Sequence, residues 1–466
     1  MSPDQSSFKL WATSTVGTPR LAIRVVVWLI EGTWLFNISI GRDRAKLYAT
    51  YLFVIGVALI LAHMDNQAGF LVFRKAASMD LANRSPYPAI GSASVYSGSS
   101  FVYPYLTSWI FAPFAALPVW LAEKLFVVVS IVAYLTGLRL IDVKSNFLVI
   151  SLVLSSVSII SFQMGTLNPI LFLAIAATWK FRDKPIVSGL FVAIAVSTKL
   201  FLFPLAAFLL LSKRFRAFAA ASALTGGVLG FGFLLGPLSA VGYYHLLTQL
   251  ARHEGGQGYS LAALLGRLAV GATPASMLAI ASSAIIFFLA LTITEPEQRQ
   301  RGIFLAAVVS SLIITPIMWA SYLPLLIPAI AVQDRRQNWL VLLGPASWIL
   351  VTPDRLGALG DVIGLAVVSA SSLLYWRQIR SEAATIPADC PQNQSQGCAP
   401  VKTGRLRAAS SYSLAFSYLA LAVVSLFGGI NLAPAVAVQI TLVVLCLLTF
   451  APSQRYPSSH LVSSMK

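Results

Sequence analysis

Charged residues are scarce in this sequence, and their scarcity excludes a water-soluble fold. Asp, Glu, Lys and Arg make up 11% of the 466 residues, whereas soluble domains carry about 25%. Hydrophobic residues make up 57%, and many of them gather in long runs such as 119–138 and 147–160. A run of about 18 apolar residues can span the hydrocarbon core of a bilayer. We therefore predict an all-α polytopic integral membrane protein with about fourteen membrane segments.

Cysteine and histidine are also rare, with three and four copies. Cys390 and Cys398 lie in a polar stretch without a nearby histidine, and Cys446 lies in an apolar run. The histidines show no spacing typical of metal ligands. We therefore expect no structural disulfide, no metal site and no cofactor.

Acidic residues are outnumbered, with 16 Asp and Glu against 33 Lys and Arg, which gives a net charge of +17. In a soluble protein this excess would suggest nucleic acid as a partner. Here the basic residues lie in short loops between apolar runs, and such loops set the orientation of a membrane protein. We therefore expect no nucleic acid, and a multi-pass protein of the bacterial inner membrane with both termini in the cytoplasm.

If every basic cluster faces the cytoplasm, an even number of crossings separates each neighbouring pair. This even number decides whether two ambiguous stretches cross the membrane. The run 105–117 must not cross, and its prolines favour a re-entrant or interfacial helix on the outer face. The segment 185–213, which is basic at both ends, must turn back on itself, with Lys199 and Pro204 near the turn.

The same map divides the chain into four parts. Residues 1–45 are expected to form a cytoplasmic N-terminal region with an interfacial helix, and 46–377 a membrane domain. Its outer, periplasmic loops lie at about 63–118 and 237–274, and the first of them is large. Residues 378–412 read as a flexible cytoplasmic linker, and 413–466 as a last helix pair and tail.

Several short motifs follow one another between residues 65 and 330. They are Phe70-Leu-Val-Phe73, Phe101-Val-Tyr-Pro104, Gly165-Thr-Leu-Asn168, Lys199-Leu-Phe, Tyr259-Ser-Leu, and Thr315-Pro316 with Trp319 and Tyr322. In order and spacing this series resembles glycosyltransferase family 87, whose members have the GT-C architecture. The resemblance implies a GT-C-like membrane domain.

The resemblance also implies an activity. Members of the family transfer a hexose, often mannose, from a polyprenyl-phosphate donor to a lipid or glycan acceptor outside the cytoplasm. That reaction needs a carboxylate to take the proton of the acceptor hydroxyl and polar or cationic groups to hold the departing phosphate. We expect the substrate-binding residues to be Lys199, Asn168, Tyr103, Trp319, Tyr322, Ser260 and Arg252.

Lys199 is the strongest of these candidates. A lysine deep in an apolar stretch is costly, and it is functional by default. The alternative is that its side chain extends to the membrane surface and serves no binding role. For the aromatic residues, the alternative is a role as interface anchors.

The sequence departs from the family at its catalytic position. Gly69 stands where the resemblance places an aspartate, and Thr166 and Ser321 replace the usual glutamine and histidine. Asp65, four residues before Gly69, is the best placed substitute, and we predict it as the catalytic base. The alternative is that Asp65 only caps the following helix. The topology leaves six acids that can reach an outer site, namely Asp65, Asp80, Glu123, Glu254, Asp354 and Asp361.

Two other functions stay open at this point. A transporter or flippase of lipid-linked glycans would suit a polytopic chain, although the sequence shows no inverted repeat. A noncatalytic member of the family would suit the missing aspartate.

Overall fold

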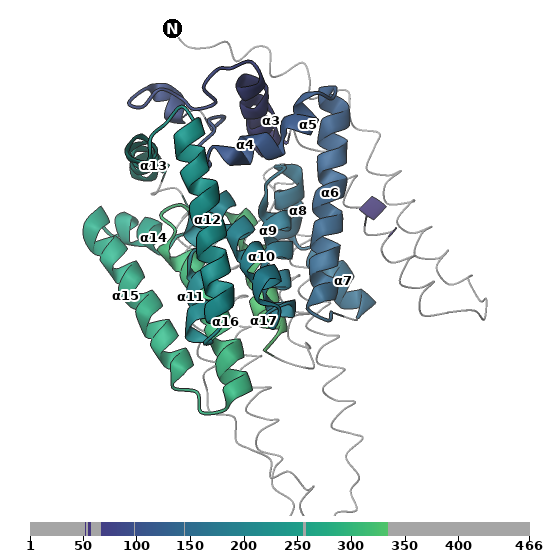
Figure 1. Ribbon diagram of the computed structural model, residues 1–466, viewed down its shortest axis with the longest axis vertical. Coiled ribbons are helices and arrows are strands. Elements are labelled where there is room, and N and C mark those ends of the chain that lie inside the picture. The colour runs from purple at the N-terminus through teal and green to yellow at the C-terminus, as the bar shows by residue number, and fades with distance from the viewer. Residues whose placement is uncertain are drawn as a thin grey trace, which may run out of the picture.

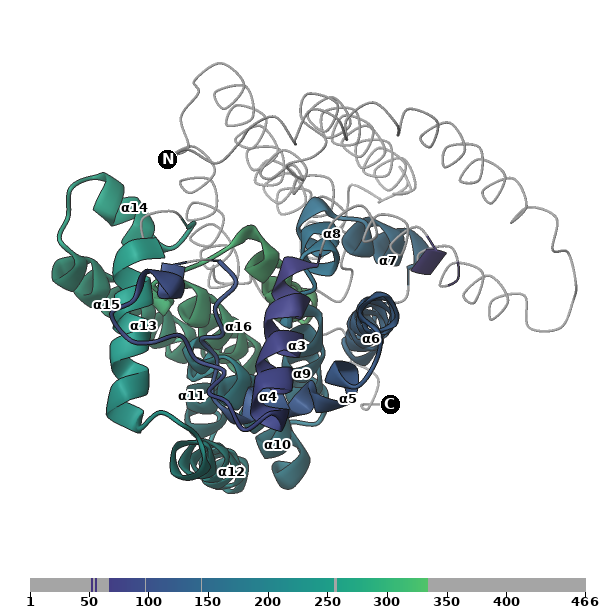
Figure 2. The same cartoon turned by 90° about the horizontal axis from the view of Figure 1, so that it is seen from above.

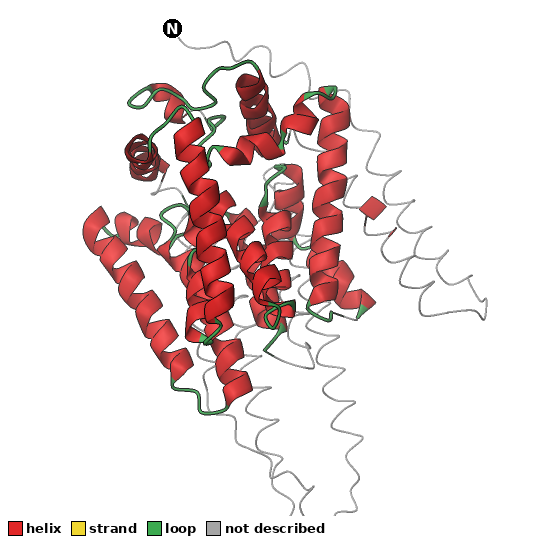
Figure 3. Ribbon diagram, in the orientation of Figure 1, coloured by secondary structure: helices red, strands yellow, loops and turns green. Residues whose placement is uncertain are grey.

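The computed structural model describes residues 67–333 apart from 97, 144 and 255–257, together with residues 52, 55 and 56. Every regular element in this part of the chain is a helix (Figures 1 and 3). Several predictions lie outside the described residues: the interfacial helix, most of the run at about 47–62, Asp65, the linker with its two cysteines, and the last helix pair.

Three helices in the described part are long and apolar enough to cross a membrane. They are α6 (Val119–Leu140), α12 (Phe215–Leu235) and α15 (Ala272–Leu291). At 1.5 Å per residue each is about 30–33 Å long, which matches the hydrocarbon core. Large apolar side chains such as Phe231 and Phe288 are exposed on α12 and α15, as expected of lipid-facing surfaces. The described part of the chain is thus all-helical with membrane-spanning helices, while the total of about fourteen segments stays a prediction.

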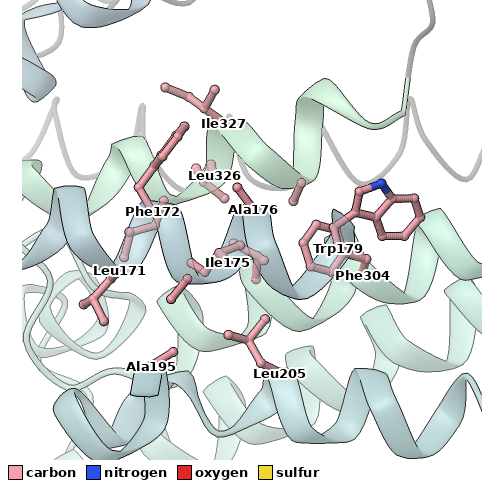
Figure 4. Packing of buried hydrophobic residues seen from close by; sticks show 14 of the residues in the cluster. Leu171, Phe172, Ile175, Ala176, Trp179, Ala195, Leu205, Phe304, Leu326 and Ile327 are labelled. Atoms are coloured by element: carbon pink, nitrogen blue, oxygen red, sulfur yellow. The ribbon is translucent and has the colours of Figure 1, made fainter. Parts of the chain in front are cut away.

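Helix α9 (Asn168–Lys180) lies in the centre of the bundle. It packs against α6, α10 (Pro185–Thr198) and α17 (Leu326–Ala331). Its apolar residues are buried on all sides, which is typical of a helix enclosed by others. Figure 4 shows how Leu171, Phe172 and Ile175 of α9 meet the side chains of the neighbouring helices. The core therefore holds α9, which begins at Asn168, in a fixed position.

The apolar run at residues 147–160 does not form one spanning helix, contrary to the length argument. It forms α7 (Asn146–Val153) and α8 (Ser156–Gln163), of eight residues each. The break lies at Ser155, whose hydroxyl accepts a hydrogen bond from Ser158 N at 3.4 Å and caps α8. A serine cap competes with helix continuation, and hydropathy alone does not register it.

The segment between α9 and α12 turns back on itself. Helix α10 ends at Thr198, Lys199 is extended with φ −136°, and the chain continues through η2 (Leu200–Leu202) and α11 (Pro204–Leu211). The two ends of the segment meet, because Arg214 Nη1 lies 2.9 Å from Asp183 Oδ1 and also donates to the Arg182 carbonyl. Lys199 therefore lies at the turn of a hairpin.

Basic loops gather at one end of the bundle, the lower end in Figure 1. Lys180 forms an ion pair with Asp142 at 3.5 Å, which joins the loops before α7 and after α9. Arg214 pairs with Asp183, and α16 (Pro296–Ile314) starts at the same end with the Glu297–Arg301 pair. One face of the described protein thus carries the basic clusters, as the positive-inside pattern requires.

The opposite end is built from the two predicted outer loops (Figure 2). The first contains α3 (Ala68–Leu81), η1 (Ala93–Tyr96), α4 (Leu106–Ile110) and α5 (Ala112–Ala115), and the second contains α13 (Ala240–Glu254) and α14 (Leu261–Arg267). At five and four residues, α4 and α5 are too short to cross a bilayer. The two loops touch, since Tyr243 OH donates to the Val102 carbonyl at 3.0 Å.

Helix α3 is fixed to the core by a close approach of two glycines. Gly69 N donates to the Met164 carbonyl at 2.8 Å, and a Cβ at Gly69 would lie 2.7 Å from that oxygen. Gly165 has φ +62°, and a Cβ there would lie 2.6 Å from Phe70 Cβ. Any side chain at either position would push α3 away from the loop between α8 and α9.

We expect Gly165→Ala to destabilise the protein strongly. A left-handed alanine costs about 1–2 kcal/mol, and overpacking against Phe70 adds about 1–3 kcal/mol. Gly98→Ala is the matched control, because Gly98 has φ +66° but open space around it. The measurement is the Tm of both variants in detergent. Equal shifts in Tm would show that the contact between α3 and the α8–α9 loop is loose.

We expect the end that carries η1 to face away from the cytoplasm. Ala93→Cys on η1 and Lys184→Cys before α10 place exposed thiols at opposite ends. In a background with Cys390, Cys398 and Cys446 replaced by Ser, an impermeant maleimide added to intact cells should label position 93 only. Labelling of position 184 alone would reverse the orientation.

Candidate functional site

The site begins at the first residue of α9. Pro169 occupies the first turn, where a missing N–H costs nothing, so the helix starts at Asn168. The Asn168 side chain is fully buried, and its Nδ2 donates to the Ser321 carbonyl at 2.7 Å. Ser161 Oγ of α8 donates to the same carbonyl at 3.0 Å. These bonds fix η3 (Ala320–Leu325) against α8 and α9.

Lys199 reaches this position from the hairpin turn. The residue is only 5% exposed, and its Nζ donates to Asn168 Oδ1 at 2.9 Å. The ammonium therefore points into the protein, and it does not extend to the surface.

Aromatic rings surround the ammonium of Lys199. Its Nζ lies 3.8 Å from the Tyr322 ring centroid and 5.9 Å from those of Tyr103 and Phe201. The Phe201 and Tyr322 rings stack, with centroids 5.2 Å apart and planes at 14°. The geometry is typical of cation–π contacts, in which a ring face attracts a cation.

The charge of Lys199 is incompletely compensated. No carboxylate of the described residues lies within 4.0 Å of Nζ. Withdrawing an ammonium from water costs several kcal/mol, while a charged hydrogen bond returns about 1.5–3 kcal/mol and a desolvated cation–π contact about 2 kcal/mol. Among the described residues, Asn168 is the hydrogen-bond partner of one of its three N–H groups. The arrangement therefore favours an anion as a further partner.

Tyr103 is held beside Lys199 by the outer end of the molecule. Its carbonyl accepts a bond from Tyr87 OH at 2.8 Å, and its ring lies 4.5 Å from that of Phe73 in α3. Burial, with a smaller contribution from the Glu254 carboxylate, raises the pKa of Tyr103 to about 12. The hydroxyl therefore stays protonated near neutral pH and can act as a hydrogen-bond donor.

The other expected binding residues are placed differently. Trp319 is partly buried at the start of η3. Ser260 caps α14, since its Oγ accepts from Ala263 N at 3.0 Å and donates to the Pro316 carbonyl at 2.8 Å. Arg252 is exposed on α13. The structure thus brings Lys199, Asn168, Tyr103 and Tyr322 together, while Ser260 is engaged in holding two segments and Arg252 faces outward.

The catalytic position of the resemblance has no room for a side chain. Gly69 lies against the backbone of Met164, so an aspartate there would require α3 to move. Asp65, predicted as the base, lies outside the described residues, and its role stays a prediction.

Two other carboxylates lie at the outer end. Asp80 of α3 is 7% exposed and accepts a hydrogen bond from Ser108 Oγ; burial raises the pKa of its carboxyl. Glu254 ends α13 and is half-buried; burial raises its pKa, and His253 lowers it to a smaller extent. From the sequence, both acids were predicted only to be able to reach an outer site.

No group of three or more histidine, cysteine, aspartate or glutamate side chains within the described ranges could hold a metal ion. The residues around Lys199 offer hydrogen bonding, cation–anion attraction and aromatic ring faces.

Comparison with known proteins gives one family match. The model of a family described as glycosyltransferase family 87 matches residues 101–316, a range that includes Tyr103, Asn168 and Lys199. No match was found among curated proteins or among solved structures. The family match supports membership of this chain in glycosyltransferase family 87.

Proposed function

We propose that the protein transfers a hexose from a polyprenyl-phosphate donor to an envelope glycan or glycolipid, and we propose mannose as that hexose. Family membership indicates a membrane glycosyltransferase; the donor, the acceptor and the outer side of the bacterial inner membrane are our proposal. The observation that carries it is the buried ammonium of Lys199, which has an amide and ring faces around it but no carboxylate partner in the described part of the chain.

The site matches the charge that the reaction develops. When the sugar leaves its phosphate, negative charge grows on the phosphate oxygen, and a pre-positioned cation stabilises that charge most in a water-poor environment. Lys199 supplies the cation, and Asn168 fixes its position. Tyr103 and Tyr322 lie beside this cation and are the aromatic residues that we propose for contact with the sugar.

A noncatalytic role is favoured by one observation, the glycine at position 69. Purified protein in nanodiscs, given radiolabelled polyprenyl-phosphate mannose and an extract of envelope lipids, separates the enzyme from the noncatalytic protein, and the same protein in liposomes tests for a flippase. Transfer of label to an acceptor supports the enzyme. Binding of the donor without transfer supports the noncatalytic role, and movement of intact donor across a liposome membrane supports a flippase.

We expect Lys199→Met to raise the KM for the donor by about 10- to 100-fold, the range for one lost charged hydrogen bond. Lys124→Met is the matched control, because Lys124 is an exposed lysine whose Nζ lies 5.4 Å from the Trp120 ring centroid. Steady-state transfer assays with both variants provide the measurement. An unchanged donor KM in Lys199→Met, at normal expression, would contradict a role in phosphate binding.

A further inference from the structure

Gln67, the residue before α3, has a backbone conformation that is unusual at the start of a helix. Its φ is 46° and its ψ is 44°, which is the left-handed region. In the described part of the chain the other non-glycine residues with positive φ are Asn83, Asp142, Lys213 and Ala269, and each follows a helix. A left-handed residue commonly ends a helix. Gln67 precedes one, and backbone strain of this kind gathers at functional sites.

The side chain of Gln67 is buried, and its amide oxygen lacks a hydrogen-bond donor. The residue is 5% exposed, and Oε1 has no partner in the part of the chain that the structure describes. Although Gln67 is the N-cap of α3, its side chain makes no capping hydrogen bond. A buried polar atom without a partner costs free energy, and in a native protein it calls for an explanation. A ligand that donates to Oε1 would explain both the strain and the burial.

The other buried side-chain atoms that lack a partner in the described ranges have simpler explanations. They are serine hydroxyls and the Nε atoms of Arg182 and Arg301. A serine hydroxyl can rotate to suit its surroundings. The two guanidinium groups donate through their other nitrogens, Arg182 to the Trp179 carbonyl at 3.1 Å and Arg301 to Glu297. Among the described residues, Gln67 is therefore the one buried carboxamide with an unsatisfied oxygen.

Gln67 lies against the turn that leads to the Lys199 cluster. A Cβ on Gly165 would lie 3.3 Å from Gln67 Cβ, so the two residues pack closely. Asn168, three residues after Gly165, accepts from Lys199 Nζ at 2.9 Å. Three residues span at most about 11 Å. Gln67 therefore packs on the first residue of a four-residue turn whose last residue holds Lys199.

The polar hydrogens nearest this contact bond elsewhere. Gly165 N donates to the Phe162 carbonyl at 3.2 Å. Thr166 donates twice to the Ser161 carbonyl, from N at 3.0 Å and from Oγ1 at 3.4 Å. An amide oxygen only accepts hydrogen bonds, so the partner that Gln67 lacks must carry an O–H or an N–H. A sugar carries O–H groups, whereas the phosphodiester of a polyprenyl-phosphate sugar carries no proton.

We propose that Gln67 binds a sugar hydroxyl, with Oε1 as the hydrogen-bond acceptor. This assignment rests on the proposed function, in which the donor hexose and the glycan acceptor both carry hydroxyls. Lys199 then binds the phosphate, and Gln67 binds the sugar. A site that hydrogen-bonds a hydroxyl also rejects a ligand without it, because the buried acceptor is then left unpaired. Gln67 is therefore a specificity-determining residue of the transferase.

The test compares the Kd values of two ligands, polyprenyl-phosphate mannose and bare polyprenyl phosphate, with purified protein in nanodiscs. Gln67→Met removes the amide and keeps an unbranched side chain. It should raise the Kd for polyprenyl-phosphate mannose by about tenfold, the effect of one hydrogen bond, and leave the Kd for polyprenyl phosphate unchanged. Lys199→Met should instead weaken both ligands, because both carry the phosphate.

A second variant separates binding from folding. Gln67→Gly relieves the left-handed backbone, because glycine adopts positive φ readily, and it removes the unpaired amide. Its Tm in detergent should not fall below that of the wild type, while its Kd for polyprenyl-phosphate mannose should rise as in Gln67→Met. Asn83→Gly is the matched control, because Asn83 is left-handed and exposed, and its Kd should stay unchanged. A lower Tm in Gln67→Gly, with equal loss of both ligands, would make Gln67 structural and overturn the assignment.

Other outcomes identify which sugar carries the hydroxyl and separate the possible failures. Suppose that Gln67→Met leaves both Kd values unchanged but needs about tenfold more envelope-lipid extract for half-maximal transfer. The hydroxyl then belongs to the acceptor, and the assignment stands. Unchanged Kd values with unchanged transfer would overturn the assignment and leave the proposed function intact. If the wild-type protein neither binds polyprenyl-phosphate mannose nor transfers its sugar, the proposed function fails and the assignment fails with it.

Discussion

The site depends on a buried ammonium that is held by an amide oxygen and aromatic rings. The Lys199–Asn168 bond joins the turn of a hairpin to the first residue of the central helix. The Asn168 amide also donates to the Ser321 carbonyl and so fixes η3 in place. A carboxylate beside Lys199 would compensate the charge more fully, but it would also compete with an anionic ligand. The amide orients the cation and leaves its charge available.

The two ends of the molecule contribute to the site in different ways. At the basic end, the Arg214–Asp183 pair closes the hairpin, so Lys199 is carried into the bundle. At the opposite end, the Gly69–Gly165 contact brings α3 onto the core, and the aromatic cluster on α3 carries Tyr103 to Lys199. Neither end alone would place a ring and a hydrogen-bond acceptor around the same ammonium.

The sequence predicted where the charged residues lie and that a lysine in an apolar stretch is functional, but it did not predict where helices are capped. The parity of the basic loops predicted the chain reversal at 185–213, and the cost of a lysine in apolar sequence singled out Lys199. Family motifs supplied Asn168, Tyr103 and Tyr322. Two helix caps were missed, Ser155, which divides the run 147–160, and Ser260 of α14. Hydropathy does not detect a cap. A serine before an apolar run is nevertheless a recognisable signal for the start of a helix.

The glycine at position 69 changes meaning once its neighbours are known. In the sequence it reads as the loss of a catalytic aspartate. In the structure Gly69 donates to the Met164 carbonyl and has no space for a Cβ, so the position serves the packing of α3. That packing holds Phe73 against Tyr103, and Tyr103 against Lys199. A carboxylate at position 69 would therefore displace α3 and weaken the packing of Phe73 and Tyr103 beside Lys199. A base for this site must therefore come from a position other than 69.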